Sequence, residues 1–87
     1  MRIEFFNRDY PKLSIRAKAG RTDSNFGLEK GRHEVVDGGP NSVQFAWKSG
    51  NERITDEEYS KYSSGPTSST TIVFGTPIGE VGASNKP

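Results

Sequence analysis

The chain contains no cysteine and only one histidine, His33, among its 87 residues. Without cysteine it has neither disulfide bonds nor a thiolate metal site. A secreted protein of this size usually depends on disulfides, so the sequence favours a reducing, cytoplasmic location. One histidine without any cysteine is not the ligand set of a zinc centre. We therefore expect neither a metal nor another cofactor.

Long apolar runs are also missing. No run exceeds three residues, as at 72–74, and such a run is far too short to cross a bilayer. The first residues lack the apolar stretch of a signal peptide. From both features we expect no association with a membrane.

Apolar residues as a class are scarce. The hydrophobic content is 30%, which stays below the roughly 45–50% usual for globular chains even after the ten glycines are added. Leucine occurs only at Leu13 and Leu28, so the core must depend on aromatic, isoleucine and valine side chains. A small domain with little apolar surface often gains stability by subunit association. We therefore expect a homo-oligomer.

The residues of a catalytic site are not visible either. His33 lies between Arg32 and Glu34 at the start of an expected strand, which favours a surface or packing role. The serine-rich stretch 63–69 has no nucleophile-elbow pattern and is interpreted as a linker. Gly75, Gly79 and Gly82 do not form a phosphate-binding fingerprint. These absences favour a protein that is not an enzyme.

Alternating apolar and polar residues predict several strands. In 12–18 the residues Leu13, Ile15 and Ala17 fall on one face and basic residues on the other. Further strands are expected at 1–7, 32–36, 43–47 and 70–75, whereas the polar, glycine-punctuated stretch 19–31 is interpreted as a long loop that contains at most a short extended piece. The turn residues at 37–42 suggest that the third and fourth strands form a hairpin.

The clearest helix signal begins at Thr55. The run 55–58 fits a capping box, in which Thr55 and Glu58 satisfy each other's backbone amides. A helix over about 56–63 follows, and its three acidic residues (Asp56, Glu57 and Glu58) suit the positive end of the helix dipole better than they suit a divalent cation. The sequence thus predicts a mainly β domain over 1–75, a small antiparallel barrel or sandwich of about five strands with one short α-helix. Residues 76–87 are expected to form a Gly/Pro-rich tail or arm.

Charge is sorted along the chain. Residues 1–32 hold eight Lys and Arg against four acids, whereas 33–87 hold four against seven. The basic groups, with two aromatic rings for stacking, form a candidate site for nucleic acid or a nucleotide phosphate. That candidate set is Arg2, Phe6, Arg8, Arg16, Lys18, Arg21 and Phe26. The simpler interpretation is that these cations are solvated residues on a strand face.

A second candidate surface would bind protein. It combines the acidic helix end with aromatic residues, and the tail would act as an arm along a neighbouring subunit. Its residues are Trp47, Tyr59, Tyr62, Ile78 and Val81. The expected function is a small non-enzymatic binding or accessory protein, such as an inhibitor of the kind common in phages and mobile elements, acting through a protein partner or self-association. Nucleic-acid binding is the alternative.

Overall fold

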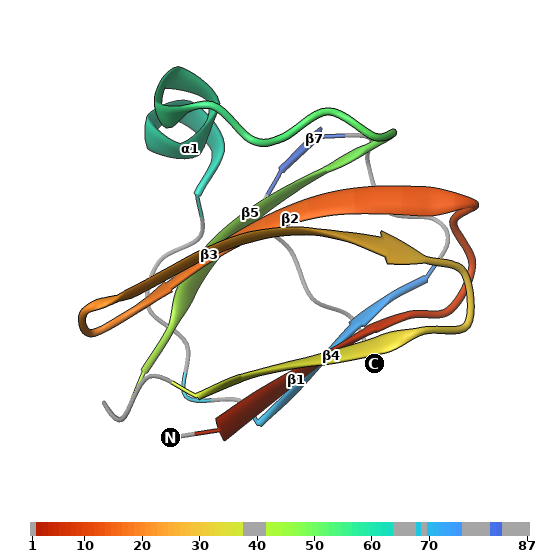
Figure 1. Ribbon diagram of the computed structural model, residues 1–87, viewed down its shortest axis with the longest axis horizontal. Coiled ribbons are helices and arrows are strands. Elements are labelled where there is room, and N and C mark those ends of the chain that lie inside the picture. The colour runs from red at the N-terminus through yellow and green to blue at the C-terminus, as the bar shows by residue number, and fades with distance from the viewer. Residues whose placement is uncertain (1, 38–41, 64–67, 69, 76–80, 83–87) are drawn as a thin grey trace.

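Two small β-sheets face each other in the computed structural model, which describes residues 2–37, 42–63, 68, 70–75 and 81–82 (Figure 1). Sheet A has the strand order β4-β1-β6 and sheet B the order β3-β2-β5-β7. Sheet A consists of β1 (Arg2–Asn7), β4 (His33–Asp37) and β6 (Thr71–Phe74). Sheet B consists of β2 (Lys12–Ala19), β3 (Thr22–Glu29), β5 (Gln44–Ser49) and β7 (Val81–Gly82). The one helix described, α1 (Asp56–Tyr62), lies on the side of sheet B that faces away from sheet A (Figure 1). The expected β-rich class, in its sandwich form, is confirmed.

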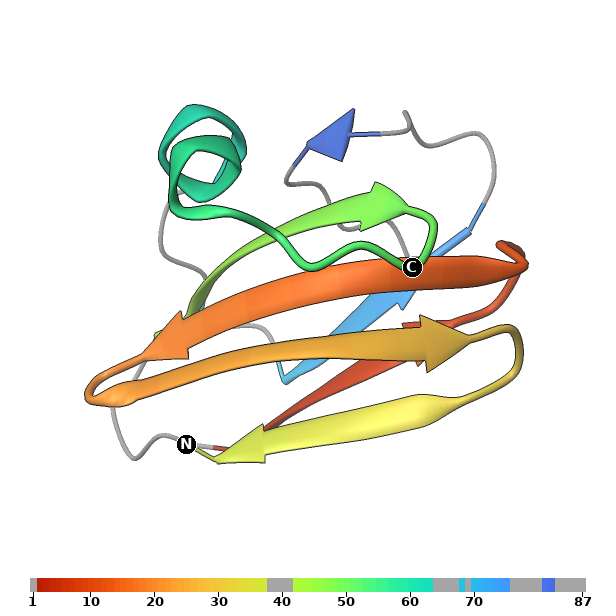
Figure 2. The same ribbon diagram turned by 45° about the horizontal axis from the view of Figure 1, so that its top comes forward.

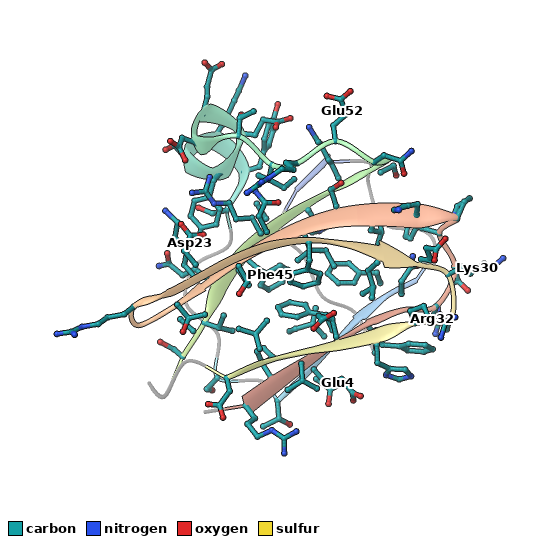
Figure 3. All side chains as sticks on the ribbon, in the orientation of Figure 1. Glu4, Asp23, Lys30, Arg32, Phe45 and Glu52 are labelled. Atoms are coloured by element: carbon teal, nitrogen blue, oxygen red, sulfur yellow. The ribbon has the colours of Figure 1, made fainter. Side chains whose placement is uncertain are left out.

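Aromatic rings fill the space between the sheets. Phe5 and Phe74 come from sheet A, and Phe45 and Trp47 come from sheet B. The ring centroids of Phe5 and Phe45 are 5.5 Å apart, and those of Trp47 and Phe74 are 5.4 Å apart. Figure 3 shows the Phe45 side chain between the two layers. These edge-on contacts supply the cohesion that the scarce leucines do not.

Local sequence signals placed the first strands and the helix correctly. In β1 the buried residues alternate, with Ile3 and Phe5 facing the core, and in β2 Leu13, Ile15 and Ala17 are buried. Thr55 accepts a hydrogen bond from the Glu58 amide, and the Glu58 side chain bonds the Thr55 amide in return. The predicted capping box is therefore present.

Most of the stretch 19–31, expected to be a long loop, is a full-length strand instead, β3 at Thr22–Glu29. β3 pairs with β2 along its whole length, from Lys12 opposite Glu29 to Ala19 opposite Thr22. It has few apolar residues because it is a sheet edge, where only Leu28 is fully buried. Its stability comes from the ladder with β2, which composition does not reveal.

The expected hairpin between the third and fourth strands is wrong. β4 pairs antiparallel with β1 in sheet A, whereas β5 pairs antiparallel with β2 in sheet B. The connection between them therefore crosses from one layer to the other, and its residues 38–41 lie outside the described part. The buried Val36 of β4 and Phe45 of β5 belong to the same core, but they face it from opposite sheets.

Two further details differ from the expected pattern. β6 pairs parallel to β1, with Glu4 opposite Thr71, so the sheets are not wholly antiparallel. In the expected tail, residues 81–82 form β7 and pair with Trp47 and Lys48 of β5. Residues 76–80 and 83–87 of that tail lie outside the described part.

Asn7 joins the two sheets at the end of β1. It is fully buried, and its side-chain amide Nδ2 donates to the carbonyl oxygens of Tyr10 and Leu28, each at 2.8 Å. Its Oδ1 accepts from the amide of Tyr10 at 3.0 Å. One side chain therefore closes the turn between β1 and β2 and fixes both to β3.

Candidate interaction surfaces

Arg16 is the centre of a polar network on the outer face of sheet B. Its Nε donates to Oδ1 of Asp23 at 3.0 Å, and its Nη2 donates to Oδ2 of the same carboxylate at 2.9 Å. Its Nη1 donates to Oδ1 of Asp56 at 2.7 Å. Only 12% of the Arg16 side chain is exposed. The guanidinium is thus shared by β2, β3 and the start of α1.

The network perturbs the acid–base equilibria of its members. The hydrogen bonds that Arg16 donates to Asp23 and Asp56 raise the pKa of its guanidinium, and the bonds donated to Asp23 lower the pKa of that carboxyl below its usual value. These are the shifts expected when opposite charges pair in hydrogen-bonding geometry. Arg16 is therefore paired with two carboxylates of its own chain.

Further contacts fasten the segment around α1 to sheet B. Nζ of Lys48 donates to both carboxylate oxygens of Glu58, at 2.9 and 2.8 Å, and this lowers the pKa of Glu58. The Asn25 side chain donates to the Ile54 carbonyl at 2.9 Å and accepts from the Ile54 amide at 3.3 Å. Together the contacts hold both ends of the segment 54–58 against three strands.

Tyr59 anchors the helix to the sheet. It is buried in a small apolar cluster with Ala46 and Ile54, and this burial raises the pKa of its phenol. Nζ of Lys18 lies 4.4 Å from the centroid of the Tyr59 ring, a cation–π distance. Lys18, like Arg16, thus has a partner within the chain.

A polar hollow of about 360 Å³ lies beside this network. Its lining residues are Arg16, Asp23, Asn25, Arg53, Ile54, Thr55 and Asp56. Because the two cations of this lining, Arg16 and Arg53, are balanced by the carboxylates of Asp23 and Asp56, the hollow offers an anion little uncompensated positive charge.

The structure divides the cations predicted to bind an anion. Arg16 and Lys18 lie on sheet B, whereas Arg2 belongs to β1 of sheet A. Arg8 follows β1, and its Nε pairs with Oδ2 of Asp9 at 3.0 Å. Arg21 is exposed at the turn between β2 and β3. Because β1 and β2 belong to different sheets, Arg2 and Arg8 do not share the strand face of Arg16 and Lys18.

The two aromatic rings of the same prediction are also separated. Phe6 faces outward from sheet A and stacks on His33, with ring centroids 4.2 Å apart and ring planes at 11°. Phe26 lies opposite Ile15 on the inner face of sheet B, where its ring contacts that of Phe5 at 5.9 Å. They do not form one stacking platform beside the charges.

The residues predicted to bind a protein partner differ in how much of each is exposed. Trp47 is only 1% exposed and Tyr59 is 7% exposed, so neither ring is on the surface, because both fill apolar clusters. Tyr62 is half-buried, with Nζ of Lys61 at 5.5 Å from its ring. Val81 is in β7, paired with the chain's own β5, and Ile78 lies outside the described residues. Tyr62 is the predicted aromatic that retains accessible surface.

The outer face of sheet A combines aromatic, apolar, polar and charged side chains. We call it the sheet-A face. Strand register places Phe6 between His33 and Val73, and in the next row Glu4 between Val35 and Thr71. Nδ1 of His33 lies 2.9 Å from Oε2 of Glu4. The sheet-A face consists of Glu4, Phe6, His33, Val35, Thr71 and Val73.

No element in the described part of the chain lies over the sheet-A face. Figure 1 shows α1 on the far side of sheet B, and Figure 3 shows the Glu4 side chain at the margin of the molecule away from sheet B. Val35 is 42% exposed. A hollow of about 250 Å³ on this side is lined by Arg2, Ile3, Glu4, Val35, Thr70 and Thr71. Sequence reasoning missed this surface because its residues come from three strands whose pairing was not known.

Within the described ranges, no three His, Cys, Asp or Glu side chains are grouped so that they would hold a metal ion. The same part of the chain contains no helix that is long and apolar enough to cross a membrane.

No protein-family model matches the chain, and neither the curated proteins nor the solved structures include one that is significantly similar to it.

Proposed function

We propose that this protein is a small non-enzymatic binding module that contacts a protein partner through the sheet-A face. The observation that carries the proposal is the uncovered row His33–Phe6–Val73 with the exposed Val35 beside it. Aromatic and apolar side chains bordered by a few charged groups are typical of the centre of a protein interface.

The composition of the face supports a protein rather than a phosphate backbone as partner. Phe6 and His33 form a flat stacked pair, and in the next row Glu4 contributes a negative charge between Val35 and Thr71. Aromatic rings contribute large contact area with little loss of conformational entropy when they are already packed. An acidic group in the middle of the face disfavours an anionic ligand.

Nucleic-acid binding is the weaker alternative because its two central cations have partners. Arg16 is paired with Asp23 and Asp56, and Lys18 lies over Tyr59. A phosphate approaching this face would meet both carboxylates as well as the guanidinium. Binding there would require the ion pairs to open.

The test of the proposal is capture from nuclease-treated extracts with tagged protein, comparing wild type with two aromatic variants. Phe6→Thr removes a ring from the sheet-A face, and the control Tyr62→Ala removes a ring from α1. We expect wild type and Tyr62→Ala to retain the same protein, and Phe6→Thr to retain at least about tenfold less, as for an interface hot spot. Thermal unfolding checks that each variant is folded.

Other outcomes of this experiment contradict the proposal. Loss of the partner in Tyr62→Ala alone would move the contact to α1. A partner that nuclease removes, together with oligonucleotide affinity that falls steeply with salt and is lost in Lys18→Ala/Arg21→Ala, would favour nucleic-acid binding. Absence of any retained protein would argue against a protein-binding module.

A further inference from the structure

We infer that the protein partner carries an acidic segment, which binds a basic surface at one end of the molecule, next to the sheet-A face. We call this surface the basic end, and it consists of Arg8, Lys30 and Arg32. The inference rests on the proposed function, because it adds the charge of the partner to the surface that binds it. Lys30 and Arg32 belong to neither of the candidate surfaces predicted from the sequence.

Two turns that are far apart in the sequence lie side by side at this end. The Lys30 amide donates to the carbonyl oxygen of Pro11 at 3.2 Å, and the Gly31 amide donates to that of Asn7 at 2.6 Å. The Asn7 amide in turn donates to the carbonyl oxygen of Arg32 at 3.1 Å. Figure 2 shows the connection from β1 to β2 and the turn from β3 to β4 at the same end of the molecule. Cations from both turns are therefore displayed together.

Lys30 and Arg32 supply positive charge that is not neutralised by a carboxylate of the described residues. Both residues are exposed, and Figure 3 shows their side chains at the same end of the molecule. Among the described residues, neither of them forms an ion pair. The adjacent acid Glu29 lies opposite Lys12 in the ladder between β2 and β3, so these two charges balance each other.

Arg8 extends the basic end to the end of sheet A. A methyl group at Gly75 would collide with the Arg8 guanidinium, so the guanidinium lies across the residue that follows β6. Its Nε also donates to Oδ2 of Asp9 at 3.0 Å. The Arg8 side chain is nevertheless 48% exposed. Arg8 is thus a positioned cation that a ligand can still reach.

The basic end borders the aromatic pair of the sheet-A face. Phe6 precedes Arg8 by two residues, and His33 directly follows Arg32. The acid of the sheet-A face, Glu4, lies one row farther from the basic end than the aromatic pair does. A partner that covers the rings can therefore reach the cations, and complementary negative charge would orient it on the surface.

The backbone at this end does not form a phosphate site. The amides of Lys30, Gly31 and Arg32 all donate to carbonyl oxygens of the same chain. The turn therefore lacks the free N–H groups that surround a phosphate in a backbone nest. Recognition depends on long cationic side chains, which suit carboxylates spread along a peptide. Because the adjoining sheet-A face is the proposed protein-binding surface, we assign the negative charge to a peptide and not to a nucleic acid.

Fluorescence anisotropy with labelled decaglutamate tests the inference, at about 0.01 M ionic strength, where the screening length is about 30 Å. Lys30→Glu/Arg32→Glu reverses two charges of the basic end. The control Arg53→Glu/Lys61→Glu makes the same change in net charge at two exposed residues in and before α1. We expect the first variant to bind decaglutamate at least about tenfold more weakly than the control does. Circular dichroism establishes that both variants are folded.

Three results would overturn the inference. Equal affinities of the two double variants would mean that net charge, and not the basic end, determines binding. Wild type that does not bind decaglutamate at this ionic strength would leave the basic end without the expected ligand. Tighter binding of undecathymidylate, which carries a similar charge, than of decaglutamate would identify the ligand as a nucleic acid.

The capture experiment links the basic end to the partner itself. We expect Lys30→Glu/Arg32→Glu to retain at least about tenfold less of the partner than Arg53→Glu/Lys61→Glu does. A partner lost in Phe6→Thr but fully retained by Lys30→Glu/Arg32→Glu would overturn the acidic segment and leave the proposed function in place. A partner that Phe6→Thr retains would instead contradict the proposed function, whatever the affinity for decaglutamate, and with it the link between the two surfaces.

Discussion

Arg16 and Asp23 form a bidentate ion pair between neighbouring strands, with Nε–Oδ1 and Nη2–Oδ2 distances of 3.0 and 2.9 Å. The third donor of the guanidinium reaches Asp56, at the first position of α1. A residue that looked like a free cation in the sequence thus has a structural role, because it connects the helix to sheet B. Its charge is not evidence for an anionic ligand.

Replacing Arg16 should therefore destabilise the fold. We expect Arg16→Ala to lower the free energy of unfolding by about 1–2 kcal/mol, because it leaves two carboxylates without their donor. The control Arg21→Ala removes an exposed cation and should change stability by less than about 0.5 kcal/mol. Urea denaturation measures both, and equal effects of the two substitutions would contradict the role assigned to Arg16.

Stability should decrease at acidic pH. Hydrogen bonds from Arg16 and Lys48 lower the pKa of Asp23 and Glu58 in the folded state relative to the unfolded state. The stabilisation is then complete above the unfolded pKa values, at about pH 4, and is lost as the pH falls below them through the lower folded ones. We expect the double variant Asp23→Asn/Glu58→Gln to be less stable at pH 7 and to show a flatter acid dependence. Chemical denaturation at several pH values measures this, and parallel profiles would contradict it.

Asn7 should be among the most sensitive polar residues. Asn7→Ala leaves the Tyr10 amide and the carbonyls of Tyr10 and Leu28 without their partner in a buried place. We expect a loss of at least about 2 kcal/mol in unfolding free energy. The matched control is Asn51→Ala, on an exposed residue, which should be nearly neutral. A similar melting temperature for both variants would contradict this role.

Removing the N-cap of α1 should lower the free energy of unfolding by less than the Asn7 substitution does. Thr55→Ala removes the side-chain acceptor for the Glu58 amide and should cost about 1 kcal/mol. Thr55→Ser keeps an acceptor and should cost clearly less. Thermal unfolding followed by far-ultraviolet circular dichroism compares the two, and the cap would have no importance if they behaved alike.

Local sequence patterns predicted much of the fold, but they did not predict the sheet-A face. Alternation identified β1 and β2, and the residues 55–58 identified the start of α1, because each signal lies within a few neighbouring residues. Arg16 and Asp56 are forty positions apart in the sequence, so no local sequence pattern predicts their contact. The same holds for Phe6 and His33, which meet only because β4 pairs with β1.

The sequence by itself determined the secondary structure that depends on side-chain periodicity and capping, and a core built on aromatic rings. Tertiary structure decided which strands become neighbours: β4 joined β1 rather than β5, β6 paired parallel to β1, and the polar β3 became a strand against β2. The physical reason is that strands pair through backbone N–H and C=O groups, which every residue carries apart from proline, which has no N–H. Which strands become neighbours therefore depends on how the two layers bury their apolar faces, and not on the local side-chain pattern.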